Sequence, residues 1–415
     1  MKTGKYLLLL LLAITQAVFS FGQQDSSKRQ QPLIDTLRKD SSRLIPDTLN
    51  RKLQVAIFTP LYLDSAFDIT DSYRYGKTFP RFINPGLEFY EGVQFAIDSL
   101  KKENASVDFR IYDTRSAKIP VQTLLQDSVF NSIDLMIGHV SVYETRLLAD
   151  AAGKKNIPFI NANFPNDAGV TNNPNYVLLN STLFSHIQGL YKFLQRNYSL
   201  SPITIFSKYH GPLEDLLKEY IATIERSTAS VPLKITYVTL QPPFTSKDLL
   251  KYLDSNTTNI CVVGSLDTQF GLNMCEELGT ISASYACTIF GMPTWDVLDF
   301  TKPAFKNLEI FYSTPFHIPP TNKTLIELTN HYRNKFYSKP SDMVFRGFET
   351  VYHFTNLLLT YKRNLRFALT DKRYRVFTDF DIQPVMDPKT NTTAYLENKK
   401  IYFIKKIDGI IKAVY

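Results

Sequence analysis

The chain has 415 residues and a formal net charge of +8. Without the first 52 residues, which are treated below, roughly 360 residues remain to fold, and this length suits two domains of ordinary size. The 47 Lys and Arg residues are scattered and form neither a concentrated basic stripe nor a known module, which argues against nucleic-acid binding.

The N-terminus has the pattern of a secretory signal. Lys2 and Lys5 precede an apolar stretch over residues 6–18, and Ser20-Phe21-Gly22 supplies small residues at a cleavage site. A run of roughly 13 apolar residues is short for a bilayer, which needs about 20. We therefore predict a cleaved signal peptide over residues 1–22 and a periplasmic or secreted protein without a membrane span. No Cys follows the predicted cleavage site, so lipid attachment is not expected.

Residues 23–52 are rich in Gln, Ser, Lys, Arg and Asp and have little to bury, so they are interpreted as a flexible linker. From residue 53 a strand-helix alternation starts. Strands are predicted at 55–58 and 107–112, and helices at 89–100 and 122–130, the first helix with apolar residues at i, i+4, i+7 and i+8.

Residues 133–165 predict two strands with the helix between them. The apolar run 135–137 is typical of a strand buried on both faces of a parallel sheet, and 157–160 forms the next strand. Ser141 and Glu144 fit a capping box at the start of the helix. A connection of this length makes the two strands parallel neighbours, so the polar residues after each strand should meet at one carboxyl edge, where α/β folds bind ligands.

The alternation of predicted strands and helices continues to the end of the chain. A strand at 176–179 and a helix at 187–194 are followed by a strand at 203–206 and a helix from Pro212. Further strands are predicted at 233–238, 260–263, 288–290, 308–312, 401–405 and 409–414, with a long helix over 346–362. Two runs of β-α units predict an α/β protein with two doubly wound, Rossmann-like lobes joined by a hinge.

In the order of its elements, the chain resembles the type I periplasmic solute-binding proteins of the branched-chain amino-acid type. The matching pieces are a strand-then-Pro opening at 55–60, Gly86-x5-Gly92-x3-Ala96, Asp113, Gly138-His139 before Ser141, Ile157-Pro158, and Gly347-Phe348-Glu349. The resemblance implies residues 53–181 plus about 317–363 in lobe one, and 182–316 plus about 364–415 in lobe two.

The resemblance also implies a small-molecule ligand between the lobes and a partner that is an ABC permease or is associated with the cell wall. Relatives that bind amino acids use a Ser/Thr run after the Gly-His-like turn, whereas this chain has Ser141-Val142-Tyr143. That departure argues against a zwitterionic amino acid and favours a larger or more polar ligand. The expected ligand class is therefore small and polar, amino-acid-like or larger.

Candidate ligand residues in lobe one lie after the predicted strands. Tyr62 lies in a long connection at 60–85 that is rich in aromatic residues. Its aromatic side chains could line the ligand site, or they could hold the connection as a surface loop by packing on one another. The Ser141 hydroxyl could bind an anionic group of the ligand or cap the helix that starts there. Tyr143, two residues later, is a further candidate for ligand contact. Asn161 and Asn163 could bind a ligand or form a turn.

Three candidates belong to lobe two. Tyr209 follows its first strand, and Asp267 could meet a ligand cation or cap a helix. Trp295, the only Trp, could stack on a ligand or pack within its own lobe.

Motifs for hydrolase, nucleotide-binding and zinc-protease chemistry are absent from the sequence, and the six His residues lack metal-ligand spacing. We therefore expect no enzyme activity, no cofactor and no metal. Cys261, Cys275 and Cys287 are expected to be buried thiols, with one disulfide among them left open. The expected function is solute binding by lobe closure, and the alternative is an envelope-associated interaction or sensory module without transport.

Overall fold

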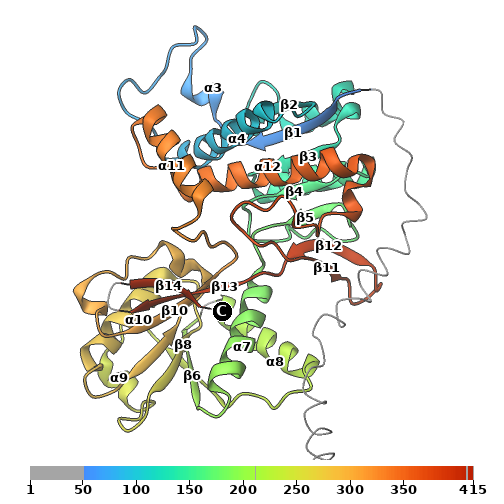
Figure 1. The fold of residues 1–415 in the computed structure, drawn as a ribbon. Helices are drawn as coiled ribbons and strands as arrows, with labels where there is room; N and C mark the ends of the chain where they lie inside the picture. Colours follow the sequence, from blue (N-terminus) through green and yellow to red (C-terminus); the bar gives the residue numbers. More distant parts are fainter. Residues whose placement is uncertain (1–50, 211, 408–409, 415) are drawn as a thin grey trace, which may run out of the picture. The chain divides into compact units, whose positions relative to one another are not determined.

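The computed structural model describes residues 51–210, 212–407 and 410–414. The predicted signal peptide and nearly all of the predicted linker lie outside these ranges. Within them the chain forms two seven-stranded sheets, each flanked by helices (Figure 1).

The first sheet has the strand order β11-β12-β5-β4-β3-β1-β2. All neighbouring strands are parallel except the β11–β12 pair at one edge. The bounds of its strands are β1 Leu53–Thr59, β2 Val107–Asp113, β3 Leu135–Gly138, β4 Phe159–Asn161, β5 Tyr176–Leu178, β11 Ile382–Met386 and β12 Thr393–Asn398.

The second sheet repeats this plan in the order β14-β13-β10-β9-β8-β6-β7, with β13 and β14 antiparallel to their neighbours. Its strands are β6 Ile203–Lys208, β7 Ile235–Leu240, β8 Asn259–Val263, β9 Cys287–Phe290, β10 Glu309–Thr314, β13 Tyr402–Ile407 and β14 Ile410–Val414. In each sheet the chain order reverses beside the first strand, which is the doubly wound arrangement predicted from the sequence.

The helices pack on both faces of each sheet. Those on the first sheet are α4 Asn84–Lys102, α5 Val121–Gln126, η3 Ser128–Ser132, α6 Val142–Lys155, α11 Lys323–Phe336, α12 Asp342–Tyr361 and η6 Lys362–Phe367. The short α3 Leu63–Ala66 lies in the connection between β1 and α4. Those on the second are α7 Leu183–Tyr198, α8 Pro212–Ser227, α9 Ser246–Leu250, α10 Thr268–Ile281, η4 Pro293–Val297 and η5 Pro303–Phe305. We call each sheet with its helices the first lobe and the second lobe.

The chain passes between the lobes three times, at residues 179–182, 315–322 and 399–401. The first crossover is bonded to the end of β12, just before the third crossover, because Ser181 Oγ donates to the Asn398 carbonyl and Asn398 Nδ2 donates to the Leu179 carbonyl at 3.1 Å. The third crossover, at residues 399–401, lies later in the chain than the lobe boundary near residue 364 that the resemblance implies. Strands β11 and β12 extend the first sheet, so only the chain after Asn398 joins the second.

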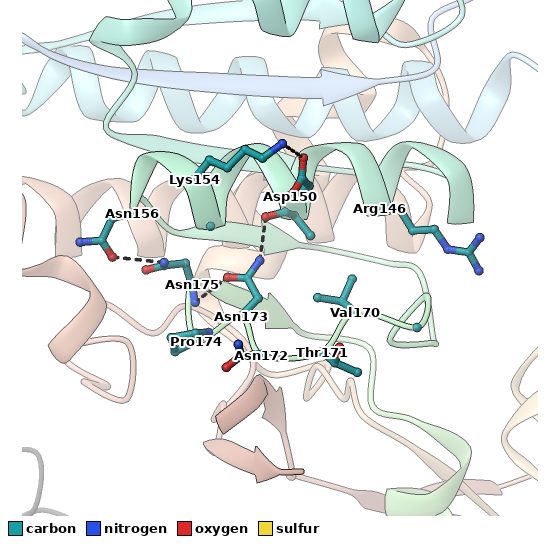
Figure 2. A pocket seen from close by; sticks show the side chains of 13 residues that line it. Arg146, Asp150, Lys154, Asn156, Val170, Thr171, Asn172, Asn173, Pro174 and Asn175 are labelled. Carbon is teal, nitrogen blue, oxygen red and sulfur yellow. Dashed lines mark hydrogen bonds and ion pairs between the residues drawn. The ribbon is translucent and has the colours of Figure 1, made fainter. Parts of the chain in front are cut away.

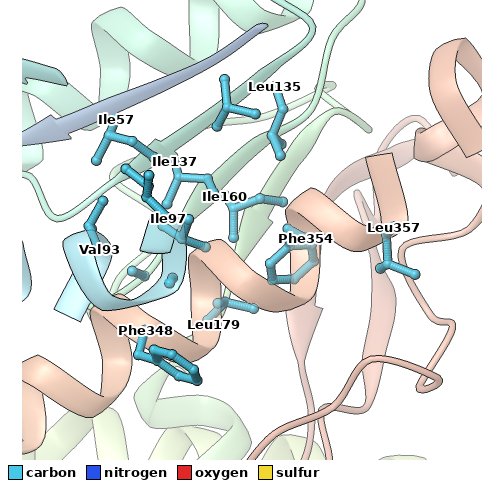
Figure 3. Close-up of a cluster of buried hydrophobic side chains, with 14 of the residues drawn as sticks. Ile57, Val93, Ile97, Leu135, Ile137, Ile160, Leu179, Phe348, Phe354 and Leu357 are labelled. Carbon is cyan, nitrogen blue, oxygen red and sulfur yellow. The ribbon is translucent and has the colours of Figure 1, made fainter. Parts of the chain in front are cut away.

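The core of the first lobe has α4 and α12 packed side by side on the sheet (Figure 3). Close approach of the helices depends on two glycines. A Cβ on Gly92 would lie 2.0 Å from the Val344 carbonyl oxygen, and one on Gly347 would lie 2.1 Å from that of Phe89. Both glycines are among the residues that carry the family resemblance, and the crossing gives them a physical reason.

Candidate functional site

A cavity of about 300 Å³ lies between the lobes, and we call it the interlobe cavity. It is lined by Asn163, Pro165, Asn180, Ser181, Leu183, His186, Leu266, Pro293, Thr294, Asp296, Thr314, Pro315, Phe316 and Arg346.

The position of this cavity follows from strand direction. Asn163 and Asn180 come just after β4 and β5 of the first sheet, and Leu266 and Thr294 come just after β8 and β9 of the second. Parallel strands place these residues at the carboxyl edges of both sheets, which is where open α/β sheets bind ligands. The interlobe cavity therefore has the location expected of a ligand site.

Arg346, in the first turns of α12, is the only Arg or Lys among the residues that line the interlobe cavity. Its guanidinium carbon lies 3.2 Å from the centre of the Phe316 ring, in the second crossover. Among the described residues, its Nη1 is buried without a hydrogen-bond partner, and the guanidinium makes no ion pair. Burial lowers the pKa of Arg346 to about 10, which leaves the group charged at neutral pH.

A second cavity, of about 500 Å³, adjoins the first and shares Asp296, Thr314, Phe316 and Arg346 with it. It adds the carboxylates of Asp342 and Glu349 to the lining. Burial raises the pKa of Asp296, and it raises that of Glu349 as well. Both oxygens of Glu349 are occupied by hydrogen bonds, including one at 2.8 Å from the Thr378 hydroxyl.

His186 on α7 is buried at the base of the interlobe cavity. Its Nδ1 lies 2.9 Å from Ser313 Oγ, and burial lowers its pKa to about 3, so the ring is neutral. His139, at the end of β3, is neutral too, since burial and then the charge of Arg346 lower its pKa to about 4. Neither histidine therefore supplies a positive charge beside Arg346.

Asn163 is the one predicted site residue that lines the interlobe cavity. Asn161 is fully buried instead, and its amide forms a turn: Nδ2 donates to Tyr176 Oη at 3.0 Å, and Oδ1 accepts from the Phe164 N–H at 3.1 Å. The predicted turn therefore accounts for the hydrogen bonds of the Asn161 amide.

Ser141 and Glu144 form the predicted capping box at the start of α6. The Ser141 hydroxyl donates to Glu144, and the Ser141 N–H donates to the same oxygen at 2.6 Å. Tyr143 is exposed and accepts a hydrogen bond from Gln122. Neither Ser141 nor Tyr143 lines the interlobe cavity, so a ligand contact by either stays a prediction.

The aromatic connection predicted around Tyr62 packs largely on itself. The Tyr62 ring meets Phe82 edge-on at 4.9 Å and lies under Arg115 at 5.8 Å. This segment does not line the interlobe cavity, and several of its apolar side chains are exposed, with Ile69 at 95%. These contacts fit the alternative that the connection is a surface loop held in place by its own aromatic side chains.

The three candidates in the second lobe also lie outside the cavity lining. Tyr209 is exposed and its ring lies beside that of His210. Asp267 caps α10 through the N–H groups of Gln269 and Phe270 and pairs with Lys208 at 2.5 Å, which together lower its pKa. Trp295 is fully buried against Gly271, Gly291 and Phe300, so it packs within its own lobe.

Sequence reasoning missed Arg346, Thr294 and Phe316. A signal for Arg346 was present, because it is a lone charge within the apolar run Val344-Phe345-Arg346-Gly347-Phe348 at a predicted helix start. The contact with Phe316 was not predictable, since it joins residues thirty positions apart through the hinge.

A larger cavity, of about 650 Å³, lies on the first lobe alone, between α6 and the loop 169–175 (Figure 2). Its polar groups mostly bond one another: Lys154 pairs with Asp150 at 2.6 Å, and Asn173 donates to the Ala149 carbonyl at 2.7 Å. It lies where β5 begins, at the amino edge of the sheet. Ligand sites of this fold class lie at the opposite edge, so we favour the interlobe cavity.

No cluster of three or more potential metal ligands occurs in the part of the chain that the structure describes. The three cysteines are free and buried. None of the described helices has the length and apolar character needed to cross a membrane.

Comparison with solved structures places this fold among type I periplasmic binding proteins. A protein from Rhodospirillum rubrum, provisionally described as a branched-chain amino acid ABC transporter, is 13% identical, with a TM-score of 0.63 over 88% of this chain and 100% of its own. A branched-chain amino acid ABC transporter periplasmic ligand-binding protein from Burkholderia xenovorans is 12% identical, with a TM-score of 0.56 over 88% and 95% of the two chains.

An ABC transporter substrate-binding protein from Desulfitobacterium hafniense, solved in complex with Leu, is 13% identical, with a TM-score of 0.54 over 87% of this chain and 99% of its own. No protein-family model matches the sequence, and neither does any curated protein. At these identities the similarity establishes the two-lobed fold, while the ligand has to be argued from this chain's own residues.

Proposed function

We propose that this chain is an exported solute-binding protein that closes its two lobes around a small polar ligand in the interlobe cavity and delivers it to an ABC importer. The observation that carries the proposal is the cavity itself, which is lined from the carboxyl edges of both sheets and by the crossovers between them. The descriptions of two structural relatives as the substrate-binding or ligand-binding protein of an ABC transporter support it.

Closure requires a ligand that interacts more favourably with the closed arrangement than with the open one. The first lobe offers the amides of Asn163 and Asn180 and the guanidinium of Arg346, and the second offers Thr294 and Asp296. A solute touching both sets would link the lobes. Contacts by Tyr62, Ser141, Tyr143, Tyr209 or Asp267 would add to this set on closure and are part of the proposal.

The first test is native mass spectrometry of the mature chain, residues 23–415, purified without refolding and compared with its denatured mass. A stoichiometric extra mass would reveal a carried solute and narrow its identity. Small-angle scattering with and without that solute should then show a smaller radius of gyration when it is bound. An unchanged radius at saturation would refute closure.

The alternative, an envelope-associated interaction module, is favoured by the segment of residues 61–83. Leu63, Phe67, Ile69, Phe79 and Phe82 all expose apolar side chains there, and exposed apolar clusters are typical of interaction sites. Under this alternative, a purified partner would bind equally well to a Thr294→Val variant of the cavity and lose affinity for an Ile69→Ser, Phe79→Ser variant. The opposite pattern would favour solute binding.

A further inference from the structure

Arg346 is surrounded by groups from several elements, and none of them completes its hydrogen bonds. Phe316 from the second crossover covers one face of the guanidinium. Asp342 and Glu349 on α12 and Asp296 on η4 act on it at longer range. In the described ranges no carboxylate lies within ion-pair distance of it, and buried Nη1 lacks an acceptor.

A second residue of the cavity lining also has a buried polar atom without a partner. The hydroxyl of Thr294, on the second lobe, has no hydrogen bond within the described part of the chain. Buried polar atoms are nearly always bonded, and an exception calls for an explanation. Arg346 and Thr294 thus each bring such an atom to one cavity, from opposite lobes. A bound group that accepts hydrogen bonds from both atoms explains why neither has a partner within the protein.

We infer that Arg346 is the anion-binding residue of the interlobe cavity and that the ligand carries a carboxylate, which Arg346 and Thr294 bind from opposite lobes. This inference rests on the proposed function and names its ligand class. Arginine suits the role because its planar, forked N–H groups match the two oxygens of a carboxylate.

The surrounding charges favour a single negative charge over a dianion. Asp296, Asp342 and Glu349 all lie near Arg346, so a doubly charged phosphate would meet repulsion that a carboxylate meets less strongly. The carboxylate of Asp296, which also lines the cavity, leaves room for a ligand that carries a cationic group as well. Burial depresses the pKa of Arg346, which is consistent with a guanidinium whose partner has yet to bind.

A stability measurement on ligand-free protein separates binding from structure. Arg346→Gln removes a buried charge that has no acceptor, so Tm should stay equal to that of the wild type or rise. A guanidinium that served the fold would lower Tm by several degrees on removal. The matched control is Arg333→Gln, which removes an exposed arginine from α11.

Binding is then measured with defined probes: the twenty common L-amino acids, the aliphatic carboxylates from acetate to adipate, and inorganic phosphate, followed by the primary amide of each carboxylate that binds. We expect a carboxylate to bind the wild type at least about 10-fold more tightly than its amide. Arg346→Gln should weaken binding of the acid by about 100-fold and leave the amide unchanged. Arg346→Lys should fall between the two, because it keeps the charge without the fork.

The two proposals fail in different ways. Wild-type affinity of Arg346→Gln for the acid, equal binding of acid and amide, or preference for phosphate would overturn the role of Arg346 while leaving solute binding intact. If no probe binds the wild type and no carried mass is found, solute binding itself fails, and the inference fails with it. Should Arg346→Gln not fold, Arg346→Lys carries the same comparison.

Discussion

At the residue scale, the partners of a polar side chain show what it does in the fold. One oxygen of Glu144 accepts from Ser141, and the other lies 3.4 Å from the Arg115 guanidinium. Glu144 is itself almost completely buried. The capping box thus ties the start of α6 to the loop that follows β2.

Ser141→Ala tests whether capping is the main role of this hydroxyl. We expect a loss of about 1 kcal/mol in the free energy of unfolding, since the variant removes one partner of the cap. Urea denaturation measures the loss. Solute affinity, measured on the same variant, separates the two roles of the hydroxyl. Unchanged affinity would leave capping as its role, and a drop of tenfold or more would show that Ser141 also contacts the ligand in the closed arrangement.

Glu397 is a second buried carboxylate with a full set of partners. It lies in β12 of the first sheet and accepts from the Thr182 N–H at 2.8 Å and the Ser185 hydroxyl at 2.7 Å, at the start of α7. Lys399 pairs with its other oxygen. One carboxylate therefore connects the first sheet, the first crossover and the third crossover.

Glu397→Ala should destabilise the protein by about 3–5 kcal/mol, because the Thr182 N–H, the buried Ser185 hydroxyl and the Lys399 ammonium all lose the carboxylate that they share. Double replacement with Lys399→Met should recover part of that loss. Thermal unfolding of both variants provides the measurement. Equal stability of the single variant and the wild type would show that the network contributes nothing.

Residues in local motifs were the most predictable. The capping box of Ser141 and Glu144 lies within four positions of sequence, so its spacing alone identifies it. Arg346 was missed because its surroundings come from Phe316, Asp296 and Thr294 on other elements. Side chains whose partners are distant in sequence leave no local pattern.

At the scale of elements, the crossing of α4 and α12 leaves no room for a side chain at Gly92 or Gly347. Gly347→Ala should cost about 1–3 kcal/mol or more, because the new methyl group would overlap the Phe89 carbonyl and push the helices apart. Gly153→Ala is the control. It lies within α6, where a Cβ would meet only the Asn173 side chain at 3.2 Å, so it should cost much less. Chemical denaturation compares the two variants.

The β3-α6-β4 unit formed as predicted, with parallel pairing of Ile137 and Ile160. Its length and its apolar periodicity were enough to specify it. Strands β11 and β12 were expected in the other lobe because strand composition does not say which sheet a strand will join. That choice depends on pairing of Leu396 with Val177, more than two hundred residues earlier.

At the scale of the whole molecule, buried neutral histidines make stability depend on pH. Burial lowers the pKa of His186 to about 3 and that of His139 to about 4, against an ordinary value of 6.5. The unfolded chain binds protons below pH 6.5 that the folded chain does not bind. Stability should therefore be constant above pH 6.5 and fall as pH drops from 6.5 toward 4.

Each such histidine contributes a slope of up to about 1.4 kcal/mol per pH unit in that window. His186→Gln should make the decline shallower, as measured by urea unfolding between pH 4 and pH 7. His331→Gln, at an exposed position, is the control and should leave the slope as it is. An unaltered slope in His186→Gln would show that other groups cause the acid sensitivity.

The three crossovers also affect how the protein is made. The first sheet needs β12, near residue 398, to cover the edge of β5, and α12 to cover its core face. A ribosome that has completed all of β1 to β5 has therefore still not released enough chain to finish that lobe. The nascent polypeptide of this lobe remains incompletely packed until β12, which ends at Asn398, has left the ribosome.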